Sequence, residues 1–224
     1  MEDQSKKQDS LVTTIVRLAA GLPLSGLIPE LLGAARKLLS RRAAEGVYEV
    51  LDYECTLELL DKKGTRATVQ KQEKVRYLQD YITTFQDQAW GDGEILLDYK
   101  CSPGLAVDQY PLGHKTYKLI SLRDLKRKGE EQEFRIQWKM RNGFLKQTGF
   151  WGTTINHPTK KVEVKVVFPR DRPPMHASIV ESDLHRTHPL APEAWQQLPD
   201  GRSMVVWELS NPILNEDYIL RWEW

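Results

Sequence analysis

The sequence predicts a mainly β protein, an antiparallel β-sandwich or less readily a barrel, with a short pair of helices at its N-terminus. From residue 47 onward, apolar residues recur at every second position in one segment after another, the pattern of half-buried strands. Turn signals such as Asn142-Gly143 separate these segments. No long crossover helix is indicated between them, which argues against parallel βαβ winding and favours antiparallel sheets.

The first 45 residues differ from the rest of the chain. Residues 1–10 are polar and carry both signs of charge, which favours a disordered tail. Residues 11–43 are rich in Leu, Ala, Ile and Arg, which favour helix, and the Gly and Pro residues between 21 and 29 divide them into two helices. We therefore expect a tail with an amphipathic helical segment over 1–45 and a β-sandwich domain over 46–224.

The first predicted strand covers residues 51–59, where apolar and charged residues alternate. A turn follows at residues 61–64. A return strand begins with the apolar residues at 67 and 69, and those at 75 and 77 fit its continuation. Further strands are predicted at 81–88, 95–99, 116–122, 134–140, 162–168, 205–209 and 218–224.

The composition narrows the classes of function. There are 32 Lys and Arg residues against 31 Asp and Glu, so the chain has no overall basic charge, and we predict that it does not bind nucleic acid. Two cysteines and a start without a secretory signal pattern predict a cytoplasmic protein. The uncharged stretch at 18–29 is well short of the ~20 residues that a membrane-spanning helix needs, so a span is not predicted.

The proline-rich stretch at 170–192 reads as the longest loop, and long loops often carry function. It holds His176, Asp183, His185 and His188, residue types that can ligate zinc. Their spacing matches no recognised metal motif, so they are weak candidates and we predict no metal and no cofactor. A metal-dependent enzyme or a small-ligand-binding protein with its site on this loop is the alternative function.

No catalytic motif stands out, because the chain has neither a Gly-x-Ser-x-Gly elbow nor a phosphate-binding glycine loop. The sequence therefore favours a non-enzymatic interaction or regulatory module that contacts an unknown protein partner or a second copy of itself. The expected contact residues are apolar and basic side chains of the N-terminal helices and two tryptophans at the C-terminus: Leu31, Leu32, Leu38, Leu39, Arg36, Arg41, Trp222 and Trp224.

Alternatives stay open for these contact residues. The helices could simply cap one open end of the sandwich, or they could lie on an anionic membrane surface, with their basic residues near the lipid headgroups. The last strand could serve strand addition if it is a sheet edge, or it could be tucked into the sheet.

Overall fold

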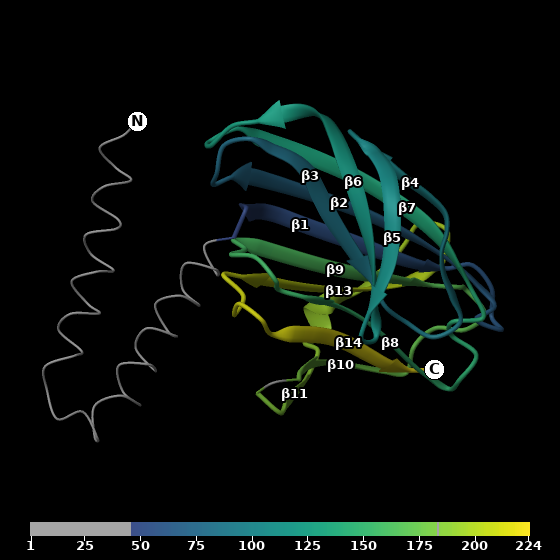
Figure 1. The fold of residues 1–224 in the computed structure, drawn as a ribbon. Coiled ribbons are helices and arrows are strands. Elements are labelled where there is room, and N and C mark those ends of the chain that lie inside the picture. The colour runs from purple at the N-terminus through teal and green to yellow at the C-terminus, as the bar shows by residue number, and fades with distance from the viewer. Residues whose placement is uncertain (1–45, 183) are drawn as a thin grey trace, which may run out of the picture. The chain divides into compact units, whose positions relative to one another are not determined.

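The computed structural model describes residues 46–182 and 184–224, and this part of the chain is mainly β with antiparallel sheets, as predicted (Figure 1). The predicted helices of residues 1–45 lie outside it. Within the described ranges, no helix has the length and apolar character to cross a membrane.

Fourteen strands and one short 3-10 helix make up the described fold. In chain order they are β1 (Tyr48–Leu59), β2 (Arg66–Tyr77), β3 (Ile82–Ala89), β4 (Glu94–Ser102), β5 (Leu105–Leu112), β6 (Lys115–Lys126), β7 (Glu131–Arg141), β8 (Thr148–Thr154), β9 (Lys161–Phe168), β10 (His176–Glu181), β11 (Arg186–Pro189), η1 (Pro192–Ala194), β12 (Trp195–Gln197), β13 (Ser203–Ser210) and β14 (Asp217–Glu223).

The strands form one large sheet and two smaller ones. The seven-stranded sheet has the order β12-β13-β9-β1-β2-β7-β4, and its strands pair antiparallel except β1 with β9. The three-stranded sheet is β3-β6-β5 and the four-stranded sheet is β11-β10-β14-β8. Both smaller sheets lie on the same side of the large sheet (Figure 1).

Aromatic contacts show which face of the large sheet the smaller sheets cover. Phe85 of β3 stacks on Phe134 of β7 with ring centroids 3.9 Å apart. Tyr218 of β14 stacks on Trp207 of β13 at 5.1 Å. The inward side chains form one buried cluster, so a single core fills the space between the layers.

The alternation predicted for the first strand is correct from Tyr53 to Leu59 but wrong before it. A β-bulge between Val50 and Asp52 shifts the register by one residue. As a result Tyr48 and Val50 are buried while Leu51 is only half-buried. A bulge changes which face a side chain points to, and the residue pattern alone does not mark it.

Strand β8 is absent from the sequence prediction because its glycines hide the alternation. A Cβ atom at Gly149 would come within 2.4 Å of the indole ring of Trp222, so this position must lack a side chain for β14 to pack beside it. The stretch at 170–192 is not a loop throughout, because β10 and β11 form an antiparallel hairpin within it.

Candidate functional site

The candidate site begins with two charged residues on the core face of β2. Side chains of a strand alternate between its faces, and the inward row of β2 is Ala67, Val69, Lys71, Glu73, Val75 and Tyr77. All six are buried, and Lys71 and Glu73 are each only 6% exposed. A lysine and a glutamate therefore occupy positions that the core normally fills with apolar side chains.

A third charged residue completes a buried ionic cluster, which we define as Lys71, Glu73 and Asp87. Asp87 lies on β3, in the sheet that covers β2, and is 1% exposed. The Lys71 ammonium donates a hydrogen bond to Asp87, and the Tyr99 hydroxyl donates a second one at 2.8 Å. The Glu73 carboxylate is 3.6 Å from Lys71 Nζ, which is beyond good hydrogen-bond distance.

The two carboxylates of the cluster are not equivalent. Burial alone would lower the pKa of Lys71, but Asp87, Tyr53 and Glu73 together outweigh burial and hold this pKa well above its ordinary value. Burial raises the pKa of Glu73, and the attraction of Lys71 is too weak to reverse this shift. Lys71 and Asp87 thus form a tight ion pair, and Glu73 is the more weakly compensated member.

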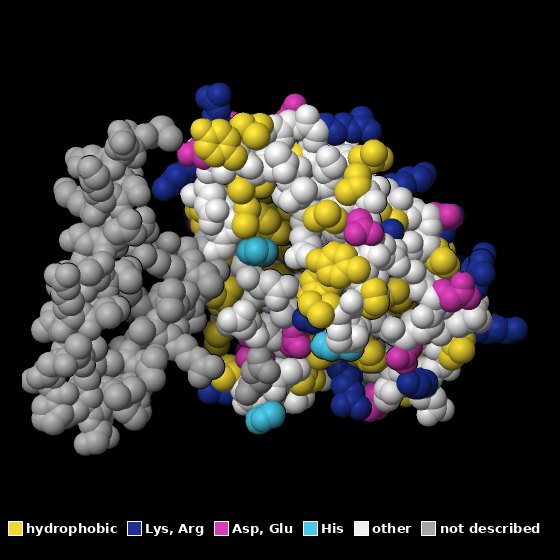
Figure 2. Space-filling view, viewed as in Figure 1, with side chains coloured by type: hydrophobic (Ala, Val, Ile, Leu, Met, Phe, Trp, Pro, Cys, Tyr) yellow, Lys and Arg dark blue, Asp and Glu magenta, His cyan; other side chains and the backbone are white. Residues whose placement is uncertain are grey.

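The ionic cluster borders a cavity of about 290 Å³. Residues of β1, β2 and β7 line it from the large sheet, and residues of β3 and β8 line it from the two smaller sheets. The exposed side chains of Gln86 and Asn156 are part of its wall, so the cavity reaches the surface. On the face drawn in Figure 2, hydrophobic side chains are recessed between more exposed atoms.

Four residues of the cavity wall carry buried polar atoms without a hydrogen-bond partner in the described structure. These atoms are the indole nitrogens Nε1 of Trp138 and Trp151, the Gln88 amide oxygen Oε1 and the His157 imidazole nitrogen Nδ1. The His157 ring packs on Tyr48 with centroids 4.1 Å apart, and burial lowers the pKa of His157. Such atoms are uncommon in proteins, since a buried polar group without a partner costs about 1–3 kcal/mol.

The cavity exists because the two smaller sheets do not pair with each other. β3 and β8 belong to different sheets, and the polar contacts between these two regions come from side chains. The Lys115 ammonium at the start of β6 donates to the Thr154 hydroxyl at 2.6 Å and lies 3.9 Å from Asp217. Lys115 also lies 5.2 Å from the centre of the Trp90 ring, and these contacts close one end of the seam.

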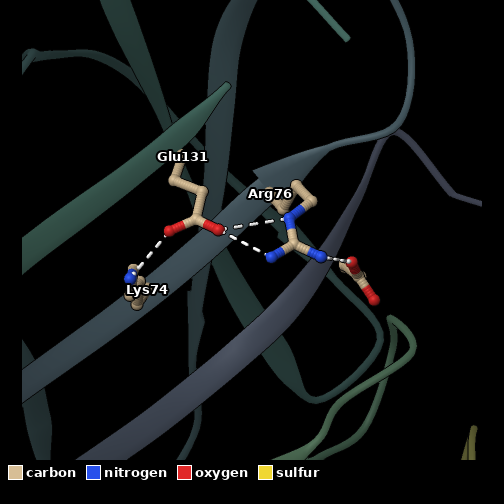
Figure 3. Close-up of polar contacts among 4 residues, drawn as sticks. Lys74, Arg76 and Glu131 are labelled. Atoms are coloured by element: carbon tan, nitrogen blue, oxygen red, sulfur yellow. Dashed lines mark hydrogen bonds and ion pairs between the residues drawn. The ribbon is translucent and has the colours of Figure 1, made fainter. Parts of the chain in front are cut away.

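The outer face of β2 carries a second ionic group, which is exposed. Glu131 of β7 pairs with Lys74 and with Arg76, each at 2.7 Å, and Arg76 also bonds Glu49 at 3.0 Å (Figure 3). Hydrogen bonds from Lys74 and Arg76 lower the pKa of Glu131 to about 2. The side chains of this group are partly exposed to solvent, so it is a surface network.

The histidines of the predicted loop site, which the structure describes, are not grouped into a metal site. His176 begins β10 opposite Glu223, whereas His188 lies on β11 opposite Ile179 and 3.9 Å from Glu181. No three His, Cys, Asp or Glu side chains among the described residues are grouped as metal ligands. Asp183 falls outside those residues, and His185 lies in the turn between the two strands.

The two C-terminal tryptophans are packed into the domain. β14 lies between β10 and β8, so it is not an edge, and the alternative that it is tucked into the sheet is correct. Trp222 is 1% exposed. The Trp224 indole donates to the Lys146 carbonyl at 2.9 Å, and the Arg172 guanidinium lies 3.6 Å from its ring centre. The helical contact residues, Leu31, Leu32, Arg36, Leu38, Leu39 and Arg41, lie outside the described part.

The residues of the ionic cluster were missed by the sequence prediction, although a signal for two of them exists. The apolar residues at 67, 69, 75 and 77 share one phase, and Lys71 and Glu73 continue it between them. Charged residues in the apolar phase of a strand indicate a buried polar site. Asp87 has the same relation to its buried neighbours Phe85 and Ala89, but nothing in the sequence links it to Lys71.

Comparison with known proteins finds similar solved structures but does not identify a family for this chain. No family model and no curated protein matches this chain. The chain is similar to an M1 zinc metallopeptidase mutant bound to L-arginine, with 12% identity, a TM-score of 0.48, and coverage of 77% of this chain and 42% of that one. It is also similar to an M1 zinc metallopeptidase from Deinococcus radiodurans, with 11% identity and a TM-score of 0.46. This similarity covers 77% of this chain and 42% of that one. The chain thus spans less than half of either structure, and no functional assignment follows from scores this low.

Proposed function

We propose that the β domain binds a small polar molecule in the cavity beside the ionic cluster. The observation that carries this proposal is the buried Glu73 carboxylate on the wall of a 290 Å³ cavity that reaches the surface. Ligand sites are usually concave spaces in which a few polar groups converge. Perturbed pKa values within it support the same conclusion.

Stability alone gives no reason to retain such a cluster. Replacing a buried ion pair by well-packed apolar residues is often neutral or stabilising, so a gain in stability does not account for the cluster. Charged groups that break the apolar pattern of a strand are more typical of functional sites. A bound ligand would also supply partners for the unpaired polar atoms of the cavity wall.

This proposal agrees with the prediction of a non-enzymatic role. It places the ligand in the cavity, whereas the alternative prediction placed a ligand on the 170–192 loop. We include the sandwich arrangement in this proposal, because a large sheet that faces two smaller sheets would enclose the cavity. A cytoplasmic location and contacts through the N-terminal helices, to a partner protein or to a membrane surface, stay predictions.

The proposal is tested by ligand-observed NMR with a defined mixture of amino acids, monosaccharides, nucleosides, small amines and carboxylic acids. Wild type is compared with Gln88→Trp, which places a large ring in the cavity and loses only a 3.5 Å hydrogen bond to the Thr154 carbonyl. The matched control is Thr84→Trp, the same new residue on the exposed part of β3.

We expect at least one compound to bind wild type and Thr84→Trp but not Gln88→Trp. Circular dichroism and thermal unfolding show that both variants are folded before they are compared. The proposal fails if no compound binds wild type, or if every compound that binds does so equally well in Gln88→Trp.

A further inference from the structure

We infer that the ligand of this cavity is a small organic ammonium compound, whose cationic group pairs with the Glu73 carboxylate while aromatic side chains surround the rest of it. This inference rests on the proposed binding function and specifies the chemical class of its ligand. It follows from three features of the cavity: an incompletely paired carboxylate, aromatic walls and the balance of buried charge.

Glu73 is a charged acceptor of the cavity wall that is incompletely paired. Asp87 accepts hydrogen bonds from both Lys71 and Tyr99, so its oxygens are occupied. Glu73 has Lys71 at 3.6 Å as its ion-pair partner, and that ammonium is already bonded to Asp87. A buried carboxylate normally has a charged partner in hydrogen-bond contact, and a ligand ammonium in the cavity would provide one.

The balance of charge favours a cation over an anion. The cluster has one cationic residue, Lys71, and two carboxylates, and burial holds the His157 imidazole toward its neutral form. Lys118 lies opposite Asp87 in the β3–β6 pair and over the Tyr99 ring, and Lys115 is paired with Asp217 at the end of the seam; neither lysine is part of the cavity wall. Adding a cation therefore neutralises the site, whereas adding an anion would place a third negative charge in it.

The remaining walls suit the organic part of such a ligand. Six tyrosine and tryptophan side chains line the cavity: Tyr48, Tyr53, Trp90, Tyr117, Trp138 and Trp151. The face of an aromatic ring attracts ammonium groups, and Lys71 already lies 5.3 Å from the centre of the Tyr53 ring. The cavity volume of about 290 Å³ corresponds to roughly ten water molecules, which suits a compound with about ten non-hydrogen atoms.

Three probes of similar size separate charge from shape: 2-phenylethylamine, 2-phenylethanol and phenylacetate. Each is titrated calorimetrically at pH 7.5 into wild type, Glu73→Gln and Glu131→Gln. Glu131→Gln is the matched control, because it makes the same substitution on the exposed outer face of the same sheet. Unfolding curves for all three proteins confirm that the variants are folded.

We expect the amine to bind wild type and Glu131→Gln at least about tenfold more tightly than the alcohol or the acid. Glu73→Gln should bind the amine at least about tenfold more weakly than wild type while binding the alcohol unchanged. Equal amine affinity in Glu73→Gln and wild type overturns the inference, as does preferred binding of phenylacetate or no binding of the amine. The NMR test with Gln88→Trp does not depend on these probes, so the binding function can stand when the ammonium assignment fails.

Discussion

The two faces of β2 carry the same kinds of residue in opposite surroundings. The inner face presents Lys71 and Glu73 to the buried core and its cavity, and the outer face presents Lys74 and Arg76 to solvent. On the inside, Glu73 lacks a close partner and burial raises its pKa. On the outside, Glu131 has two cationic partners that lower its pKa to about 2.

The difference shows that placement, not residue type, decides what an ionic group does in this domain. Exposed ion pairs contribute little because water and salt screen them and because their long side chains lose freedom. Buried charges have large effects when they are altered, since removing one partner leaves the other without compensation. Substitutions on the two faces should therefore differ in size and, for the glutamates, in sign.

The largest effect is expected from Lys71→Met on the inner face. This substitution leaves Asp87 and Glu73 buried without a cation, and we expect the free energy of unfolding to fall by about 3–5 kcal/mol at pH 7. Urea unfolding followed by circular dichroism measures the loss.

The double variant Lys71→Met/Asp87→Leu is the control for Lys71→Met. It removes both members of the tight pair, so it should lose less stability than the sum of the two single substitutions. Additive losses would mean that Lys71 and Asp87 do not act as a pair.

Cys55 extends the comparison to β1, where it lies directly opposite Lys71. Burial raises the pKa of Cys55 to about 11, and it also raises the pKa of Cys101, which is half-buried on the edge strand β4. At pH 8 we expect Cys55 of the folded protein to react with a thiol reagent at least about tenfold more slowly than Cys101, because the thiolate is the reactive form.

The variants Cys101→Ser and Cys55→Ala isolate the two rates of thiol reaction. Adding denaturant should raise the rate of Cys55 to that of an ordinary exposed thiol. A fast reaction of Cys55 in the folded protein would contradict the burial of this side chain.

A smaller effect of opposite sign is expected from Glu73→Gln. Because burial raises the pKa of Glu73, its ionised form costs stability in the folded protein, and the neutral amide avoids that cost. We expect a gain of about 1 kcal/mol at pH 7.5, measured by urea unfolding.

The pH dependence of the Glu73→Gln effect follows from the direction of the pKa shift. The folded protein holds the Glu73 proton more tightly than the unfolded chain, whose glutamate has a pKa near 4.5. The gain should be complete above the raised pKa of the folded state and should vanish as the pH falls below about 4.5. A gain that persists in acid would have another cause than ionisation.

The smallest effect is expected from Glu131→Gln on the outer face. Its lowered pKa means that ionised Glu131 stabilises the folded state above about pH 4.5, and that this contribution is lost as the pH falls toward 2. We expect the melting temperature at pH 7.5 to fall by about 1 °C, with a smaller difference in 1 M salt. A loss as large as that of Lys71→Met would contradict the contrast between the two faces.

Much of the large sheet could be predicted from sequence because its inner face is mostly apolar. The alternation at 134–140 and 162–168 marks β7 and β9, and the Asn142-Gly143 signal marks the end of β7. β8 could not be predicted in the same way, since glycines stand where the alternation needs side chains. The alternation of a strand shows which of its side chains are buried, but it does not show which strands lie beside it. The position of β14 in the interior of its sheet therefore could not be predicted from the sequence.

The candidate site was only partly readable from sequence. Lys71 and Glu73 stand in the apolar phase of their strand, which is a local signal of burial. Asp87 reaches them because β3 packs over β2 from a different sheet, and no spacing rule describes that contact. The cavity arises from the missing pairing between β3 and β8, a property of how the sheets pack.

The most direct test combines stability and binding in one experiment on wild type and Glu73→Gln. The melting temperature of each is measured at pH 7.5 with and without 2-phenylethylamine. Without amine, Glu73→Gln should melt at the higher temperature, and with amine only wild type should rise, because ligand binding stabilises the state that it binds. An equal rise in both proteins, or a lower melting temperature for Glu73→Gln without amine, would contradict the role given to Glu73.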